Sequence, residues 1–291
     1  MPLFPAKPND LDYAAWRDSK LSKAIPGTQS SLIHLTNAVC LDQHERQQLI
    51  QRCQQHNFAL YQFDNPSQNQ KSVVHNFAAQ LGLQHLSGNL CADTDQLSSI
   101  TVTQHSGQPA YIPYTAKKLS WHTDGYYNPT AQQIHGMLLH CIRPATNGGI
   151  SYLLDHELAY ILLRDENPAY IDALFASDAL TIPANIIKGK IIRPAQSGPV
   201  FSITPQGRLH MRYSARLRNI EWKNDSVTHE AAAFLQALWK TGNPLIIEYK
   251  LEKSQGILCN NILHARTAFE DDAHAPRLLL RGRYYDSIGH H

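Results

Sequence analysis

The sequence predicts a mixed α/β protein that is mainly β, with a jelly-roll barrel or sandwich core and helices on its outside. From about residue 98 onward, short segments rich in β-branched and aromatic residues alternate with Gly, Pro and Asn turns. Fewer segments show amphipathic helical periodicity, and they lie at the front and in the middle of the chain. Barrels and sandwiches of this length often form one unit, so we expect a single domain over residues 1–291.

The first part of the chain predicts an irregular leader followed by helix, strand and helix. Residues 1–30 are rich in Pro, Asp, Ser and Gly, which predicts irregular chain on the surface. Residues 41–56 have the spacing of an amphipathic helix, with Asp42 near its start. Residues 58–63 predict a short strand and residues 69–83 a second helix.

Residues 98–286, within a few positions, predict the β core with a helical insert. Strands are predicted over residues 100–103, 134–142, 150–154, 186–192, 200–204, 209–213, 245–249, 256–262 and 278–285. Turns or loops are predicted at 106–109, 147–149, 207 and 219–229. Helices are predicted over 156–175, where Asp155 is a candidate cap, and over the Ala-rich segment 230–240.

Composition and charge exclude several kinds of partner. The chain has 26 basic and 24 acidic residues, and this formal charge of +2 is too small to indicate nucleic acid or an anionic membrane. The five cysteines form no CxxC pair, which argues against a disulfide scaffold or structural zinc and favours a reducing compartment. We find no signal-peptide pattern and no apolar run long enough to span a bilayer, so we expect a cytoplasmic protein with a small-molecule substrate. The sequence is also compatible with a homo-oligomer.

The segment WHTDGYYN at residues 121–128 carries two candidate metal ligands. On a strand, His122 and Asp124 would project to the same side. Iron held by two His and one carboxylate keeps positions open for other ligands. His264 is the best candidate for the third ligand, since it sits where a strand is expected to break into a turn. With 16 His in the chain, HxD alone is a weak signal, and a polar strand segment is the alternative.

The segment PRLLLRGRY at residues 276–284 alternates apolar residues with guanidinium groups. Arg277, Arg281 and Arg283 are two or four residues apart, so all three are expected on one side of a strand. An Arg fork suits bidentate binding of a carboxylate, which Lys cannot reproduce. A surface strand that simply carries charge is the alternative reading.

Together, the motifs WHTDGYY, NGGIS, NNILHARTAF and PRLLLRGRYYD resemble those of the taurine dioxygenase-like (TauD/TfdA) family. The resemblance runs from about Tyr114 to Asp286 and implies a double-stranded β-helix fold. It also implies an oxygenase that uses Fe(II), 2-oxoglutarate and O2. In this family pattern, the iron ligands correspond to His122, Asp124 and His264.

The resemblance also assigns cosubstrate-binding residues. Arg277 matches the arginine that pairs with the distal carboxylate of 2-oxoglutarate, and Ser151 stands where the family usually has a Thr that bonds the same group. Arg281 matches a second arginine that in some members helps to bind an anionic substrate, and it could equally serve the cosubstrate. The usual His-Gly-Arg is here His264-Ala265-Arg266, which should keep ligation but alter the local turn.

The implied reaction is oxidative decarboxylation of 2-oxoglutarate coupled to hydroxylation of a small, anionic substrate. Related halogenases replace the carboxylate ligand by a small residue, so Asp124 favours hydroxylation or desaturation over halogenation. Candidate substrate contacts are Lys118 and Ser120, which share parity with His122, together with Tyr114, Tyr126, Tyr127 and Asn128; for the tyrosines, ordinary packing is the alternative. Asn260 and Asn261 are expected to orient His264, and His135 and His140 to be structural.

Two other function classes compete with this reading. A non-catalytic metal- or small-molecule-binding protein on the same barrel would be favoured by a damaged triad or by loss of Arg277, and the sequence shows neither. A hydrolase using zinc-bound water lacks the HExxH spacing and leaves Arg277 without a purpose.

Overall fold

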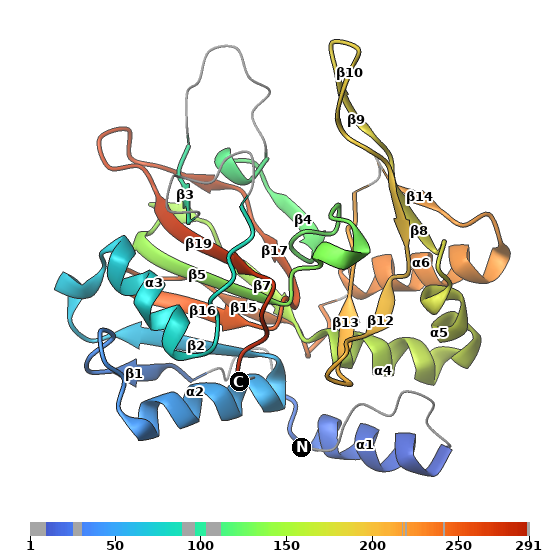
Figure 1. Ribbon diagram of the computed structural model, residues 1–291, viewed down its shortest axis with the longest axis horizontal. Helices are drawn as coiled ribbons and strands as arrows, with labels where there is room; N and C mark the ends of the chain where they lie inside the picture. The colour runs from blue at the N-terminus through green and yellow to red at the C-terminus, as the bar shows by residue number, and fades with distance from the viewer. Residues whose placement is uncertain are drawn as a thin grey trace.

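Two β-sheets packed face to face form the centre of the molecule. The computed structural model describes residues 10–25, 31–88, 97–102, 112–216, 218, 220–240 and 242–289. Within these residues the architecture is mixed α/β, with many strands and six α-helices (Figure 1). The larger sheet has the order β1-β2-β16-β5-β19-β3, and the smaller has the order β15-β7-β17-β4. The strands of the larger sheet are β1 (Ile33–Leu35), β2 (Phe58–Phe63), β16 (Gln255–Cys259), β5 (Gly136–Arg143), β19 (Leu278–Tyr284) and β3 (Ser98–Ile100). Those of the smaller sheet are β15 (Ile247–Tyr249), β7 (Ser151–Leu154), β17 (Leu263–Arg266) and β4 (Leu119–His122).

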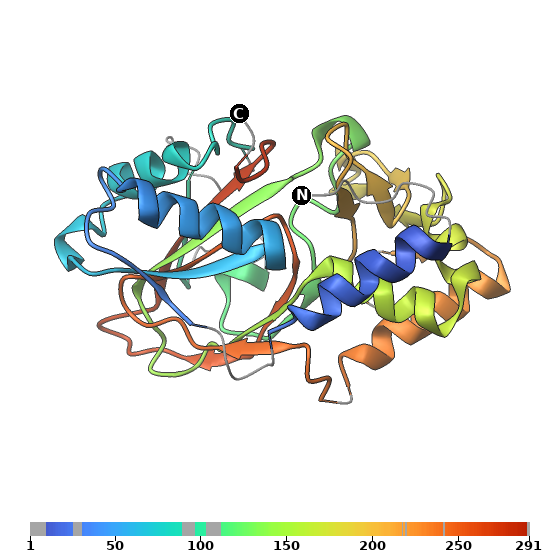
Figure 2. The same ribbon diagram turned by 90° about the horizontal axis from the view of Figure 1, so that it is seen from below.

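The central strands of the larger sheet are buried on both faces, which explains why β2 and β16 are mostly apolar. In β16, Ile257 and Cys259 point into the core between the two sheets, whereas Leu258 packs on the helix side. That second face is covered by α2 (Gln43–His56) and α3 (Lys71–Gln80), as Figures 1 and 2 show. Side chains that alternate between two apolar layers need no polar face, so such strands read as continuous apolar runs.

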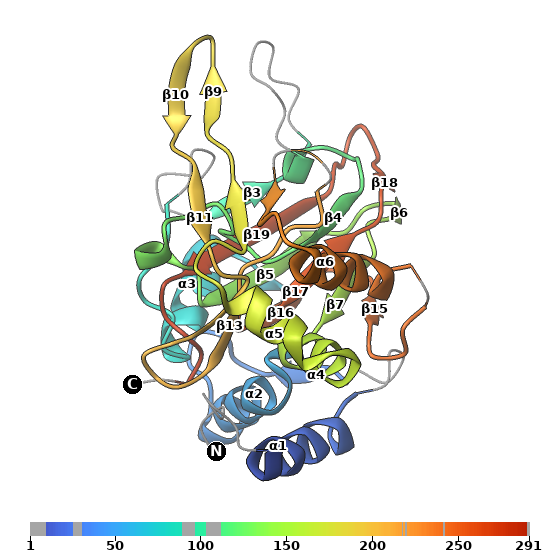
Figure 3. The same cartoon turned by 90° about the vertical axis from the view of Figure 1, so that its right-hand side faces the viewer.

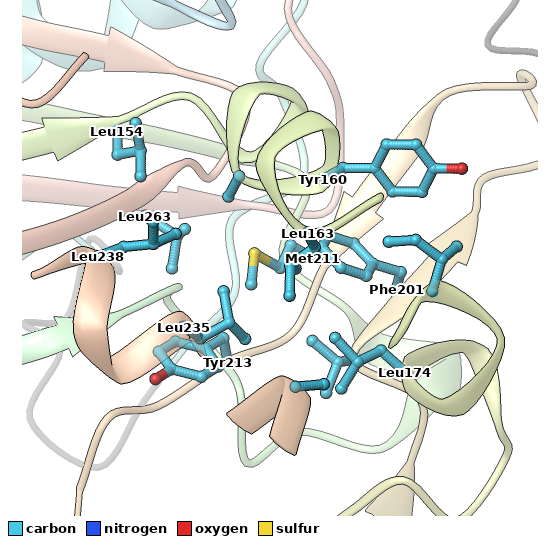
Figure 4. Packing of buried hydrophobic residues seen from close by; sticks show 14 of the residues in the cluster. Leu154, Tyr160, Leu163, Leu174, Phe201, Met211, Tyr213, Leu235, Leu238 and Leu263 are labelled. Atoms are coloured by element: carbon cyan, nitrogen blue, oxygen red, sulfur yellow. The ribbon is translucent and has the colours of Figure 1, made fainter. Parts of the chain in front are cut away.

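The smaller sheet is covered by a long insert between β7 and β15. Its helices α4 (His156–Glu166), α5 (Pro168–Phe175) and α6 (Ser226–Leu238) enclose a second core (Figure 4). Its short strands are β8 (Leu180–Ile182), β11 (Gln196–Gly198), β12 (Phe201–Ile203), β13 (Leu209–Met211) and β14 (Glu221–Trp222). The hairpin β9 (Asn185–Ile187) and β10 (Lys190–Arg193) projects from this side of the molecule (Figure 3). A small pair, β6 (Asn147–Gly148) and β18 (Phe269–Glu270), completes the strands, and 3₁₀ turns lie at Pro66–Gln68, Ile112–Tyr114 and Thr130–Gln132.

Several predicted elements are confirmed. The strand over 58–63 is β2, and Asp42 caps α2 in a capping box with Glu45. Asp155 caps α4 by accepting a hydrogen bond from Glu157 N, as expected. The turn at 147–149 is confirmed by positive φ angles at both glycines.

Other predicted elements are wrong. Helix α1 (Asp10–Ser22) replaces part of the irregular leader, because Tyr13 and Trp16 pack their rings against Tyr160 of α4. The helix predicted over 156–175 is broken at Asn167, since Pro168 cannot continue it and instead begins α5.

The remaining differences concern strands and the extent of the core. Residues 186–192 form a hairpin, and the predicted loop at 219–229 contains β14 and the start of α6. Strands β1 and β2 belong to the larger sheet, so the β core is not confined to 98–286. The turn predicted at 106–109 lies outside the described residues. Among the described helices, none has the length and apolarity needed to cross a membrane.

Candidate metal centre

The cross-strand pair of His122 and His264 forms the middle of the candidate centre. His122 ends β4, and it is directly opposite His264 in the antiparallel register of β4 with β17. The two ring centroids are 4.2 Å apart. His264 therefore lies inside a strand, and not where a strand breaks into a turn as the sequence predicted. The turn comes just before it, at Asn261, whose φ of 50° is in the left-handed region.

Each of these imidazoles is oriented by a backbone carbonyl two residues earlier in the chain. His122 Nδ1 lies 2.8 Å from Ser120 O, and His264 Nδ1 lies 2.9 Å from Ile262 O. A carbonyl only accepts hydrogen bonds, so Nδ1 carries the proton and Nε2 keeps its lone pair. Burial, followed by the charge of the facing His264, lowers the pKa of His122 to about 3, and burial lowers the pKa of His264 as well. Both rings are therefore neutral near pH 7 and offer Nε2 as a ligand atom.

Asp124 lies beyond the strand, in a turn built on Gly125 and Asn261. Because β4 ends at His122, strand alternation does not bring Asp124 to the side of His122, and that part of the prediction is wrong. Gly125 has a φ of 68°, and a Cβ at this position would collide with Ile134. The Asn261 amide accepts from Asp124 N at 2.7 Å and donates to Asp124 O at 2.9 Å. Asn261 thus positions Asp124, and not His264 as expected.

The Asp124 carboxylate faces two arginines of β19. Its Oδ1 lies 3.3 Å from Arg281 Nη1, whereas its buried Oδ2 has no hydrogen-bond partner among the described residues. Burial by itself would raise the pKa of Asp124, but the charges of Arg281 and Arg283 outweigh it and hold the pKa well below its usual range. The carboxylate is therefore ionised and has one oxygen available.

These three side chains fit a divalent iron. One ligand atom from each of His122, Asp124 and His264 lies within 4.8 Å of the others. Two neutral imidazoles and one carboxylate grouped in this way leave the other positions of an octahedral metal open. The buried, unpartnered Asp124 Oδ2 supports this fit, since a buried polar atom without a partner costs free energy unless a ligand satisfies it.

Arg277 is a buried cation at one end of β7. Its guanidinium lies 5.0 Å from the Phe269 ring centroid, and its Nε is 3.8 Å from where a Cβ on Gly149 would stand. Burial lowers the pKa of Arg277 to about 10, so it stays protonated near pH 7. It makes no hydrogen bond or ion pair with any residue in the described part of the chain. Ser151, the first residue of β7, is buried two residues beyond Gly149. A carboxylate would complete this end of the strand.

The strand alternation that would place Lys118 and Ser120 beside His122 is interrupted. The pairing of β4 with β17 shifts register between His122 and Leu119, which inserts one extra residue into β4. Lys118 and Ser120 are exposed, whereas His122 is buried. The parity argument is therefore wrong here, and a substrate role for these two residues stays a prediction.

The other predicted substrate contacts differ in what they touch. The Tyr126 ring stands edge-on to His122, with centroids 6.3 Å apart. Asn128 donates to Gln132 O at 2.9 Å and so stabilises the turn. Tyr114 ends a 3₁₀ turn, is half-buried and packs against the core between the sheets.

Three arginines have roles that the sequence pattern did not reveal. Arg283, expected only as part of a strand face, donates to Tyr127 Oη at 2.7 Å. Arg266 donates to the carbonyls of Thr115 and Lys117, which fixes the segment leading into β4. Arg212 donates to Tyr126 O and to carbonyls around β8 and β11, which holds the turn after Asp124. Only the fold brings these carbonyls together, so no local signal could have predicted the contacts.

Two residues that were expected to be structural can also be placed. His140 is fully buried and lies 3.1 Å from Tyr61 Oη and 2.8 Å from Asn69 Oδ1, so both of its ring nitrogens have partners. His135 stands against His210, with ring centroids 4.9 Å apart. Neither histidine belongs to the group formed by the three candidate ligands.

Sequence comparison places this arrangement among known proteins. A family model described as "Taurine catabolism dioxygenase TauD, TfdA family" matches residues 19–283. A uridine-5'-phosphate dioxygenase of Streptomyces sp is 30% identical over 203 residues, which are 66% of this chain and 70% of that relative. A uridine-5'-phosphate dioxygenase of Amycolatopsis sp is 28% identical over 178 residues, or 57% of this chain and 61% of that relative.

Solved structures show the same fold at low sequence identity. An asparagine oxygenase bound to Fe(II), 3-hydroxyasparagine and succinate has a TM-score of 0.61 at 14% identity, covering 97% of this chain and 92% of that one. The non-heme iron oxygenase OrfP, with Fe, succinate and a dihydroxyarginine, has a TM-score of 0.62 at 16% identity, covering 87% and 83%. A taurine dioxygenase from Burkholderia xenovorans has a TM-score of 0.57 at 18% identity, covering 91% and 89%.

Proposed function

This chain belongs to the TauD/TfdA family of Fe(II)- and 2-oxoglutarate-dependent oxygenases, and from that premise we propose that His122, Asp124 and His264 are its iron ligands. The enzyme is a 2-oxoglutarate-dependent dioxygenase that acts on a small substrate. The facing six- and four-stranded sheets form the double-stranded β-helix core of one domain in this proposal. The observation that carries the ligand assignment is the set of three converging atoms, with each His Nδ1 tied to a carbonyl and Asp124 Oδ2 left without a partner.

The protein's own part in the reaction is to orient groups and exclude water. When bound, the iron supplies the dioxygen chemistry, which no side chain in this site provides. The backbone carbonyls behind His122 and His264 fix the ring orientation, and Asn261 fixes the backbone of Asp124. All three ligands are buried or nearly so, which limits the access of bulk water to the centre.

In the same proposal, Arg277 and Ser151 hold the distal carboxylate of 2-oxoglutarate. Arg277 is a buried cation that has no acceptor among the described residues, and a guanidinium can bind a carboxylate through two parallel hydrogen bonds. The Ser151 hydroxyl would add one further donor at the end of β7. Arg281, which contacts Asp124, stands between the ligand set and the substrate side and could serve either molecule.

We further propose an organic anion as substrate, with hydroxylation or desaturation as the outcome. Two relatives are named for uridine-5'-phosphate, and buried arginines face the centre from β19. An intact carboxylate ligand at Asp124 supports oxygen transfer over halogen transfer. The four described cysteines are free thiols, which supports the expectation of a reducing, cytoplasmic location.

Anaerobic spectroscopy tests the ligand assignment. Fe(II) with 2-oxoglutarate should give a weak visible charge-transfer band in the wild-type protein, and His122→Ala should abolish it. His140→Gln is the matched control, because His140 is a buried histidine whose two ring nitrogens already have partners. This variant should keep the band. A wild-type protein that shows no band and consumes no 2-oxoglutarate would falsify the proposed function.

A further inference from the structure

Arg281 and Arg283 are buried cations with unused hydrogen-bond donors. They are 9% and 3% exposed, and they lie two residues apart on β19, so both project to the same side of the strand. Arg281 reaches Asp124 through Nη1, and Arg283 reaches Tyr127 through Nη1. The Nε of each is buried without a partner among the described residues. Such donors normally find an acceptor, so each of these groups requires an explanation.

The neighbouring buried arginines show how this chain satisfies a guanidinium when no ligand is involved. Arg212 donates to the backbone carbonyls of Tyr126, Leu180, Gly198 and Gln196, and a longer contact reaches the carbonyl of Pro199. Arg266 likewise donates to the carbonyls of Thr115 and Lys117. Arg281 and Arg283 receive no such carbonyl in the described part of the chain. Their Nε donors are therefore left for an acceptor outside these residues.

The charges at the centre favour a specific kind of acceptor. Iron(II) brings two positive charges and Arg277 one, while Asp124 and 2-oxoglutarate together bring three negative charges. The charges of these groups sum to zero, so within the described part of the chain the positive charges of Arg281 and Arg283 are not offset. The described partner of Arg283 is the Tyr127 hydroxyl and not a carboxylate. A buried charge is costly unless it is paired.

We propose that Arg281 and Arg283 bind a doubly charged oxyanion of the substrate, of the phosphomonoester class. In this proposal Arg283 makes the site prefer a dianion over a monoanion. This inference rests on the proposed function, because the charge count includes the metal and 2-oxoglutarate. Arg281 already forms an ion pair with Asp124. Arg283 is held in place by its hydrogen bond to Tyr127 and forms no ion pair with a carboxylate of the described residues. A tetrahedral dianion supplies enough acceptor oxygens for both guanidinium groups.

The surroundings of Tyr126 and Tyr127 extend this positive region outward. Between Asp178 and Glu221 the chain has no acidic residue, and its basic residues include Arg193 and Arg216. The Arg193 guanidinium lies 5.8 Å from the Tyr127 ring centroid. Burial raises the pKa of Tyr126, and the nearby charge of Arg216 opposes that rise. One sign of charge along the approach to a site concentrates ligands of the opposite charge.

Two probes of nearly the same shape separate one charge from two. Methyl phosphate is a dianion at pH 8, because the second pKa of a phosphate ester is about 6, whereas methyl sulfate is a monoanion. Each would be titrated calorimetrically, without oxygen, into protein loaded with Mn(II) and 2-oxoglutarate. We expect methyl phosphate to bind at least about tenfold more tightly than methyl sulfate.

Variants of the clamp test the role of Arg283. Arg283→Gln should weaken methyl phosphate binding by about 30-fold and remove the preference over methyl sulfate. Tyr127→Phe keeps the charge but removes the hydrogen bond that orients it, so a smaller loss is expected. Arg52→Gln, which changes an arginine of α2 on the far side of the larger sheet, is the matched control and should bind both probes as the wild type does.

The outcomes separate this inference from the proposed function. Binding of 2-oxoglutarate to the metal-loaded protein is measured in the same preparations. If 2-oxoglutarate binds but methyl phosphate is not preferred, or if both Arg283→Gln and Tyr127→Phe leave methyl phosphate binding unchanged, the dianion site is wrong and the oxygenase stands. If 2-oxoglutarate itself fails to bind, the proposed function is wrong and the charge count behind this inference falls with it.

Discussion

Two regions of this molecule bury charged side chains, and they differ in whether the polar atoms of these side chains have partners in the chain. Where α1 meets α4, Lys20 Nζ lies 2.6 Å from Asp155 Oδ2, contacts Glu157 Oε2 and donates to Gln55 O at 2.8 Å. Each carboxylate contact is a charge-assisted pair with the ammonium, so neither oxygen lacks a partner. At the metal centre, Asp124 Oδ2 and the Nε atoms of Arg281 and Arg283 have no partner in the part of the chain that is described.

The difference separates structural charge from functional charge. All three ammonium protons of Lys20 are directed at groups of the chain itself, so that cluster is complete without a ligand. The centre is incomplete, although it is equally buried. Burial alone therefore does not identify a site here. The grouping of unused donors and acceptors around Asp124 does, and four predictions test that distinction.

The largest effect is expected when the complete cluster is broken. Lys20→Met leaves Asp155 and Glu157 buried without their cation and should lower the free energy of unfolding by about 3–5 kcal/mol. Urea denaturation measures this loss, and 2-oxoglutarate binding to the folded variant should stay as in the wild type. Lys23→Met, at an exposed lysine just after the same helix, is the control and should be nearly neutral. Equal stabilities for the two variants would contradict the structural role of Lys20.

A loss at the incomplete centre should instead affect ligand binding. Structural sites with four ligands bind their metal with a free energy of about 10–16 kcal/mol, which is about 3–4 kcal/mol for each ligand. His264→Ala removes one ligand, so metal affinity should fall by several hundredfold. Metal titration of the purified protein measures this change. The metal-free variant should unfold within about 1 kcal/mol of the wild type, because the His264 ring has a single hydrogen bond to the described residues, which goes to the nearby backbone carbonyl of Ile262. A large loss of stability with unchanged metal affinity would reverse the assignment.

A third, intermediate effect concerns pH. Burial lowers the pKa of His140 to about 3, from a value of about 6.5 in the unfolded chain. Between these values the unfolded chain binds a proton that the folded chain does not, so stability falls as pH falls. From pH 7.5 to 5.5 this contribution is about 1.4 kcal/mol. In metal-free protein, the free energy of unfolding of His140→Gln should therefore fall by about 1.4 kcal/mol less than that of the wild type between pH 7.5 and 5.5. Equal decreases in the two proteins would show that His140 does not contribute.

The smallest effect is expected at the cosubstrate end of the centre. Ser151→Ala removes one proposed hydrogen bond to 2-oxoglutarate, worth about 1 kcal/mol or roughly fivefold in its dissociation constant. Ser151→Thr keeps the hydroxyl and should bind 2-oxoglutarate nearly as the wild type does. If the alanine and threonine variants bind equally, the hydroxyl is not a cosubstrate contact.

Much of the fold and the ligand set could be predicted because the signals are local or repeated. Strand β2 is apolar over nearly its whole length since both of its faces are buried, and this pattern is visible without the fold. Helix α1 was not predictable in this way, because its apolar residues are few and packing against α4 stabilises it. The position of Asp124 depends on a left-handed Asn261 that comes from a distant part of the chain, so strand alternation predicted the wrong local structure for a residue that does lie beside the two histidines.

The direct pairing of His122 with His264 also has a consequence for the order in which the protein is made. β4 leaves the ribosome long before β17, and the loop between them holds the whole insert. Contacts this distant in sequence form slowly, and amino-terminal segments are synthesised and collapse first. No nascent chain that stops before β17 carries all three candidate ligands. The full set of candidate metal ligands is therefore assembled only after the insert and β17 have been synthesised, so shorter chains cannot hold a metal in this way.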